Sequence, residues 1–229
     1  MNAYLIIGIS SGLGRVLFQK YSKDNLTFAI TSKKELVNKK IAFYSLDKNI
    51  DDQRDKLANI ENMLSNFKNH KFNIILNSAI YDKKDDNLED KKNILNINYF
   101  NQISIYEFLV NKVKIKVSKI IFFSSFEALK KYSNMQYYRL SKIMYIAQYH
   151  HFIKNQNSPI VKLFILGGIK TDSYNKNTKI KKSIITKYLP KDVETAALFV
   201  IKKIKTNKSE IIYYPKYYYY LNIVKNIIS

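Results

Sequence analysis

The sequence predicts an α/β fold in which helices flank a doubly wound, mostly parallel sheet of seven strands. The expected strands are continuous apolar runs, as strands buried on both faces are, and helical patterns alternate with them along the chain. A glycine-rich turn joins the first strand to the first helix. No repeat or linker divides the chain, so we expect one domain over 1–229, with a Tyr-rich tail at about 215–229.

Each expected element follows from its pattern of apolar residues. The strands are expected at 3–8, 26–31, 40–46, 72–77, 119–125, 159–166 and 209–215, and the helices at 14–21, 51–67, 97–110, 134–155 and 191–204. The segment 51–67 is amphipathic, because its apolar residues recur with the spacing of one helix face. Strands that alternate with helices imply right-handed βαβ units.

Composition excludes several classes of protein. No apolar run approaches the roughly 18–20 residues that span a bilayer, and the first residues lack the basic region and cleavage site of a signal peptide. Cysteine is absent, which excludes disulfides, thiolate catalysis and Cys-ligated metals. We therefore expect a cytoplasmic protein with no metal site.

The net charge of +21 raises the question of an anionic partner. Only three of the 39 basic residues are arginines, and the lysines are spread along the whole chain. Arginine is the usual residue for bidentate recognition of bases and phosphates. We therefore expect no dedicated nucleic-acid function.

The glycines gather where a strand meets a helix. Three of the five glycines, Gly8, Gly12 and Gly14, stand in "GISSGLG". At such a turn glycine lets the backbone approach a pyrophosphate, which rests on the N–H groups of the helix N-terminus. The spacing is G-x-x-x-G-x-G, which differs from the commoner G-x-G-x-x-G.

This turn resembles the nucleotide-binding turn of the short-chain dehydrogenase/reductase family, whose members have a Rossmann-type fold. Further matches follow in the family's order: "NSAI" (77–80), "LNINYFN" (95–101), "FFSS" (122–125), "YRLSK" (138–142) and "LGGIKT" (166–171). The resemblance covers nearly the whole chain. Ser78, Ile80 and Leu166 depart from the family pattern, which has Asn, Gly and Pro at those places.

The segment "YYRLSK" contains two tyrosines that could act as an acid–base group. A free tyrosine has a pKa of about 10, and a lysine ammonium one helical turn away would lower it. Tyr138 has Lys142 at that spacing, whereas Tyr137 has Ser141, which carries no charge. Tyr44 has a lysine four residues on as well, but it stands at a strand end, where the helical argument fails.

The resemblance implies roles for four catalytic residues. Tyr138 would exchange a proton with the substrate oxygen, and Ser125 would polarise that oxygen, with Ser124 as the alternative. Lys142 would lower the pKa of the tyrosine and bind the nicotinamide ribose. Asn98 would hold a water in the proton relay, and Asn96 and Asn101 compete with it for that role.

The resemblance also implies the residues that bind the cofactor: Gly8, Ser10, Ser11, Gly12, Leu13, Gly14, Ser32, Lys33, Lys34, Asp47, Asn77, Ser78, Ala79, Tyr138, Lys142, Gly167, Gly168, Ile169 and Thr171. An NAD enzyme of this fold usually has an acid after the second strand, at the ribose 2′-hydroxyl. Here Ser32, Lys33 and Lys34 come first and Glu35 comes too late. We therefore expect NADP(H) in preference to NAD(H), with Asp47 at the adenine.

The implied function is an NADPH-dependent carbonyl reductase or alcohol dehydrogenase that assembles as a homodimer or homotetramer. The alternative is a non-catalytic dinucleotide-binding or basic interaction protein on the same fold. Lysines between Thr171 and Pro190 would suit an anionic substrate such as a phosphorylated or nucleotide-linked sugar derivative. The Tyr-rich tail would pack on the protein or a partner subunit, or contact a membrane surface.

Overall fold

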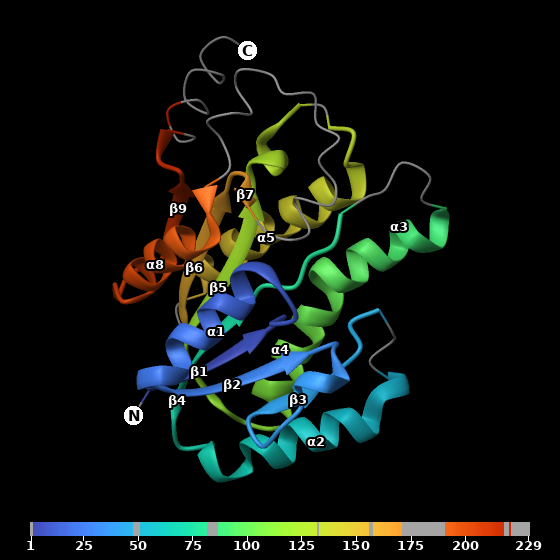
Figure 1. The fold of residues 1–229 in the computed structure, drawn as a ribbon, viewed down its shortest axis with the longest axis vertical. Coiled ribbons are helices and arrows are strands. Elements are labelled where there is room, and N and C mark those ends of the chain that lie inside the picture. The colour runs from blue at the N-terminus through green and yellow to red at the C-terminus, as the bar shows by residue number, and fades with distance from the viewer. Residues whose placement is uncertain are drawn as a thin grey trace.

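Seven strands form one sheet at the centre of the computed structural model, which describes residues 2–47, 51–81, 87–131, 133–155, 158–170, 191–217 and 220 (Figure 1). The strands are β1 (Asn2–Ile7), β2 (Leu26–Thr31), β3 (Ile41–Phe43), β4 (Lys71–Leu76), β5 (Lys116–Ser125), β6 (Ile160–Leu166) and β9 (Glu210–Tyr214). Their order is β3-β2-β1-β4-β5-β6-β9, and every pair of neighbours is parallel. The predicted fold class is confirmed.

The helices are α1 (Gly12–Asp24), α2 (Arg54–Leu64), α3 (Leu88–Leu95), α4 (Asn101–Asn111), α5 (Gln136–Lys154) and α8 (Val193–Ile204). Short 3-10 turns occupy Lys34–Leu36 (η1), Asp51–Gln53 (η2), Ser65–Phe67 (η3) and Phe126–Leu129 (η5). A π-helical turn, η4 (Asn96–Phe100), joins α3 to α4. Two short strands, β7 (Ile169–Lys170) and β8 (Lys191–Asp192), pair in parallel.

Two predictions of elements were wrong in detail. The strand predicted over 40–46 covers only Ile41–Phe43. The helix predicted over 97–110 is a π-helical turn over Asn96–Phe100 followed by α4, and before it stands α3, which was not predicted and begins at a capping box between Asn87 and Asp90. That box is a helix start signal in the sequence, and the apolar pattern alone did not find it.

Two hydrophobic clusters cover the two faces of the sheet. One cluster contains Ile60 of α2, Leu109 of α4 and Tyr145 of α5. The other contains Leu17 of α1 and Val200 of α8. Successive residues of the central strands alternate between the clusters, so each strand is buried on both faces. This burial explains the continuous apolar runs in the sequence.

The strand order reverses between β1 and β4. From β1 the chain proceeds outward through β2 and β3, and then returns to place β4 on the other side of β1. At such a switch point the turns after the two central strands diverge, which opens a crevice at the carboxyl ends of the strands. The turns that follow β1 and β4 carry the predicted motifs "GISSGLG" and "NSAI".

Parts of the chain lie outside the described residues. These include most of the predicted Tyr-rich tail at 215–229 and all of 171–190, where the lysines of the expected substrate segment stand. No helix of the described ranges is long and apolar enough to cross a membrane.

Two lysines are buried at the amino ends of β5 and β6. The Lys119 ammonium donates to the carbonyl oxygens of Ile204 (2.8 Å) and Thr206 (3.0 Å) at the end of α8. Lys162 is fully buried, and its ammonium lies 2.7 Å from a carboxylate oxygen of Glu210 and also contacts the Thr206 hydroxyl. The Lys162–Glu210 pair thus ties β6 to the edge strand β9.

Breaking that pair should destabilise the fold. Glu210→Gln leaves the buried Lys162 charge without its counter-ion, and we expect a loss of about 3 kcal/mol in the free energy of unfolding in urea. Lys208→Ala is the control, because Lys208 lies 3.7 Å from the other Glu210 oxygen but its side chain is 71% exposed. That variant should change stability by less than about 0.5 kcal/mol. Equal effects of the two substitutions would contradict this account.

Candidate active site

A cleft of about 350 Å³ lies where the strand order reverses, between the turns that follow β1 and β4. Eight of the predicted cofactor-binding residues line it: Gly8, Ser10, Ser11, Ser32, Asp47, Asn77, Ser78 and Ala79. Its other lining residues, which the sequence analysis missed, are Ser45, Leu46, Ile80 and Ile97. Residues from five separate segments therefore meet in one hollow.

The glycine turn is packed too closely for any other residue. Gly8 and Gly12 have positive φ angles of +94° and +57°, which favour glycine. A Cβ atom on Gly8 would lie 2.2 Å from the Ser78 hydroxyl oxygen, and one on Gly14 would lie 2.0 Å from the Gly8 carbonyl oxygen. The Asn77 amide donates to that same carbonyl (3.0 Å). The turn after β1 is therefore locked against the loop after β4.

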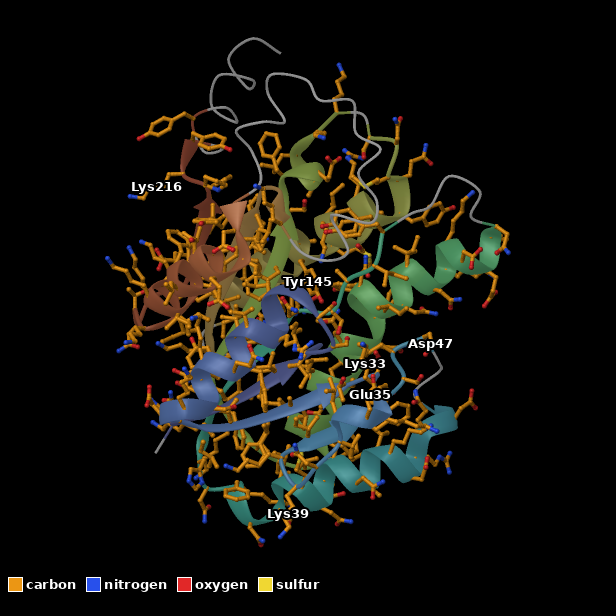
Figure 2. The ribbon with its side chains drawn as sticks, in the orientation of Figure 1. Lys33, Glu35, Lys39, Asp47, Tyr145 and Lys216 are labelled. Carbon is orange, nitrogen blue, oxygen red and sulfur yellow. The ribbon has the colours of Figure 1, made fainter. Side chains whose placement is uncertain are left out.

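The residues that follow β2 carry both positive and negative charges. Ser32 lines the cleft, and the Lys33 ammonium lies 3.7 Å from a carboxylate oxygen of Glu35. The Lys34 ammonium lies 5.6 Å from the centroid of the Phe43 ring. Figure 2 shows Lys33 and Glu35 at the same end of the sheet as Asp47, whose carboxylate accepts a 2.7 Å hydrogen bond from the Ser45 hydroxyl. Glu35 offsets part of the positive charge there.

Other predicted cofactor residues lie outside the cleft lining. The Leu13 side chain is buried in the core beneath α1, so it can offer a ligand only its backbone. Gly167 donates its N–H to the Tyr214 carbonyl (2.8 Å), and Gly168 follows it. Ile169 belongs to β7. Thr171 lies outside the described residues.

The two serines at the end of β5 have different surroundings. The Ser124 hydroxyl is buried and donates to the Lys142 carbonyl (2.8 Å), so it joins the strand to α5. The Ser125 hydroxyl accepts from the Glu127 N–H (3.2 Å) and hydrogen-bonds with Tyr138. Of the two predicted alternatives, Ser125 is the serine that meets the tyrosine.

Tyr138 is buried beside Ser125, with only 6% of its surface exposed. Burial raises the pKa of its phenol well above the ordinary value, and the neighbouring Tyr81 adds to the rise. The hydrogen bond with Ser125 acts in the opposite direction, and the Glu127 carboxylate raises the pKa further. The structure therefore holds Tyr138 as a protonated phenol.

Lys142 is buried one helical turn after Tyr138. Its amine donates to the Phe123 carbonyl (3.0 Å) and lies 5.4 Å from the centroid of the Tyr138 ring. Burial lowers the pKa of Lys142 to about 7. Both groups are desolvated, and a pKa of about 7 leaves Lys142 only partly charged near neutral pH. That Lys142 lowers the pKa of Tyr138 stays a prediction.

Asn98 is completely buried in the π-helical turn. Its side-chain oxygen accepts from the Ile80 N–H (2.7 Å), and its amide donates to the Ile80 carbonyl (2.9 Å) and the Ser141 hydroxyl (3.1 Å). Asn98 thus connects the loop after β4 to helix α5. Its competitor Asn101 instead donates to the Leu46 carbonyl (2.6 Å).

The remaining neighbours distinguish the two tyrosines of the motif. Tyr137 is half-buried, and the Lys91 ammonium lies 5.8 Å from its ring centroid. Tyr138 has a second aromatic neighbour, Tyr81, which the sequence did not predict. The centroids of the two rings are 4.5 Å apart. The available signal was the place of Tyr81, directly after "NSAI".

The chain was compared with family models, with curated proteins and with solved structures, and only the solved structures match it. No family model and no curated protein matches the chain. Among solved structures, a short chain dehydrogenase family protein from Francisella tularensis is 21% identical with a TM-score of 0.68, and the match covers 93% of this chain and 97% of that one. The chain therefore has the fold of the short-chain dehydrogenases.

Two further structures of this fold were solved with nucleotides. A short chain dehydrogenase from Burkholderia cenocepacia in complex with NADP has a TM-score of 0.74 at 15% identity, covering 99% of this chain and 92% of that one. A 4-hydroxyisoleucine dehydrogenase complexed with NADH has a TM-score of 0.71 at 13% identity, covering 93% and 96%.

The buried lysine should leave a signature in the pH dependence of stability. Between pH of about 7 and 10.5 the unfolded chain keeps the Lys142 proton while the folded chain loses it, so this group makes stability rise with pH. Lys142→Met lacks the effect. From pH 7 to 9, the free energy of unfolding of the original protein, measured in urea, should therefore rise relative to that of this variant by roughly 1 kcal/mol per pH unit. A difference that is independent of pH would contradict the burial of the amine.

Proposed function

We propose that the chain is an NADP(H)-dependent short-chain dehydrogenase/reductase that interconverts a ketone and a secondary alcohol. The observation that carries this proposal is the meeting of Ser125, Tyr138 and Lys142 at the carboxyl end of β5. Two neighbouring hydroxyl groups with an amine one helical turn away are suited to acid–base chemistry, which supports this proposal over a simple binding site.

The residues of the cleft fit a dinucleotide. Gly8 and Gly14 leave room where any side chain would collide with backbone or with the Asn77 and Ser78 side chains, and α1 begins at this point. A helix N-terminus with closely approachable backbone is suited to a pyrophosphate. Ser32 and Asp47 would face the adenosine half. When bound, the nicotinamide supplies or accepts the hydride.

Tyr138 is the general acid in reduction. Its phenol donates a proton to the substrate oxygen as negative charge develops there, and takes the proton back in the oxidation direction. Ser125 donates a hydrogen bond to the same oxygen, which stabilises that charge. A phenol is protonated at neutral pH, which is the form that reduction requires.

Lys142 and Asn98 support this proton transfer. Lys142 would hold the ribose hydroxyls of the cofactor, and hydrogen bonds to those hydroxyls favour its ammonium form over the neutral amine. The ammonium then favours the phenolate that Tyr138 becomes. Asn98 acts mainly as a positioning residue, because its side chain hydrogen-bonds with Ile80 and Ser141.

NADP(H) is proposed in preference to NAD(H). Ser32 lines the cleft and is followed in the chain by Lys33 and Lys34, whose ammonium groups would offset the charge of a 2′-phosphate bound there, although neither lysine is among the lining residues. The ion pair between Lys33 and Glu35 reduces the strength of this preference. A homodimer or homotetramer and a sugar-derived substrate remain expectations of the family resemblance.

The acid–base assignment of Tyr138 predicts that turnover is lost while cofactor binding is retained. Tyr138→Phe removes the proton donor but keeps the ring, so NADPH affinity should stay nearly unchanged while carbonyl reduction falls by about a thousand-fold or more. Tyr137→Phe removes a hydroxyl from the adjacent residue and should leave turnover intact. Calorimetry of NADPH binding and NADPH oxidation over a carbonyl panel measure both quantities. Full activity of Tyr138→Phe would refute the assignment.

The cofactor preference predicts an effect on one nucleotide alone. Replacing Lys33 and Lys34 together by alanine should raise the Kd of NADPH roughly ten-fold, because the 2′-phosphate loses its exposed counter-charges, and leave that of NADH unchanged. Lys39→Ala is the control, since Lys39 is exposed and lies far from Lys33 in Figure 2. Equal weakening of both nucleotides, or of neither, would contradict the preference.

A further inference from the structure

An exposed aromatic surface lies beside the buried Tyr138. The cleft lining ends at Ile80, and the next residue, Tyr81, packs its ring against that of Tyr138, with centroids 4.5 Å apart and planes tilted by 38°. Ile80 and Tyr81 are nevertheless 39% and 37% exposed. An apolar and aromatic surface therefore continues from the end of the cleft to the proton donor.

The backbone under this surface is held by four hydrogen bonds. The Gln102 side chain accepts from the Ser78 N–H (3.2 Å) and donates to the Ser78 carbonyl (2.8 Å). Asn98 repeats the pattern two residues later, with bonds of 2.7 and 2.9 Å to the N–H and carbonyl of Ile80. Both amide side chains are completely buried. Tyr81 is thus attached to an anchored backbone.

An anchored but exposed tyrosine is well suited to contact a ligand. Tyrosine offers a large, flat contact area with few rotatable bonds, so little conformational entropy is lost when a ligand packs on it. Pockets for small molecules are lined mainly by such apolar and aromatic side chains, with a few polar groups that orient the ligand. The polar group beside the Tyr81 ring is the Tyr138 hydroxyl, with the Ser125 hydroxyl as its neighbour.

The position of Tyr81 determines which part of a substrate it meets. A carbonyl oxygen that bonds both Ser125 and Tyr138 must approach the phenol hydroxyl, and the Tyr81 ring lies directly against the Tyr138 ring. A substituent on the carbonyl carbon therefore comes next to Tyr81. The Tyr81 phenol also interacts with the Tyr138 phenol, which places its polar end at the same point.

We propose that Tyr81 is a specificity-determining residue whose ring packs on the group attached to the substrate carbonyl, so that the site prefers carbonyl compounds with a flat apolar substituent. Aryl ketones represent this class, and small aliphatic ketones lack the stacking surface. Offset or tilted aromatic contacts favour the former beyond the area that they bury. The proposal rests on the proposed function, because it takes Ser125 and Tyr138 as the groups that receive the carbonyl oxygen.

Ligand binding tests the proposal without requiring turnover. Acetophenone and 2-butanone are titrated into the full chain with NADP+ present, and the Kd of each is measured for the original protein, Tyr81→Ala and Tyr81→Phe. The original protein should prefer acetophenone. Tyr81→Ala should weaken acetophenone binding roughly ten-fold and change 2-butanone binding little, whereas Tyr81→Phe, which keeps the ring, retains the preference.

Tyr220→Ala serves as the matched control, because Tyr220 is a 65% exposed tyrosine near β9 and lines a different hollow. It should leave both affinities unchanged, and urea unfolding of each variant reports whether it is folded. An original protein that binds neither ketone or binds both equally would overturn the proposal, as would equal loss of both ligands in Tyr81→Ala. If acetophenone is preferred but the protein reduces no ketone with NADPH, the proposed function is wrong and Tyr81 is a ligand-contacting residue without a role in substrate choice.

Discussion

The attachment of helix α5 to strand β5 is the constraint on which the candidate site depends. Three consecutive strand residues take part. The Phe123 carbonyl accepts from the Lys142 amine (3.0 Å), the Ser124 hydroxyl donates to the Lys142 carbonyl (2.8 Å), and Ser125 hydrogen-bonds with Tyr138. One lysine therefore contacts the strand through both its side chain and its backbone. This pairing sets the helix register that brings Tyr138 beside Ser125.

The second constraint is the close packing of the turns after β1 and β4. The Asn77 amide and the Gly8 carbonyl hold those turns together, and the absence of side chains on Gly8 and Gly14 permits the approach. Asn98 then continues from the loop after β4 to α5 through Ser141. The cleft and the acid–base group are thus parts of one connected network, in which a buried amine and a buried phenol are retained despite the free energy lost on desolvation.

The sequence was sufficient to predict the sheet, because strands buried on both faces are continuous apolar runs, and to predict that Tyr138 and Lys142 lie one helical turn apart on α5. The catalytic roles of these two residues stay predictions. It did not predict α3, whose start depends on the Asn87 capping box. The contact of Tyr81 with Tyr138 joins segments far apart in the chain, and its one local signal was the place of Tyr81 directly after "NSAI". The pKa directions of Tyr138 and Lys142 depend on burial, which a helical spacing does not measure.

Transfer of deuterium from the cofactor to a carbonyl compound tests the central claim most directly. NADPH deuterated at the transferable C4 position is incubated with the protein and a panel of aldehydes and of aryl, aliphatic and sugar-derived ketones, and the alcohols are analysed by mass spectrometry. At least one alcohol should carry a single deuterium on the former carbonyl carbon. A protein that binds NADPH and yet transfers deuterium to no member of the panel would be a dinucleotide-binding protein without this chemistry, contrary to the account.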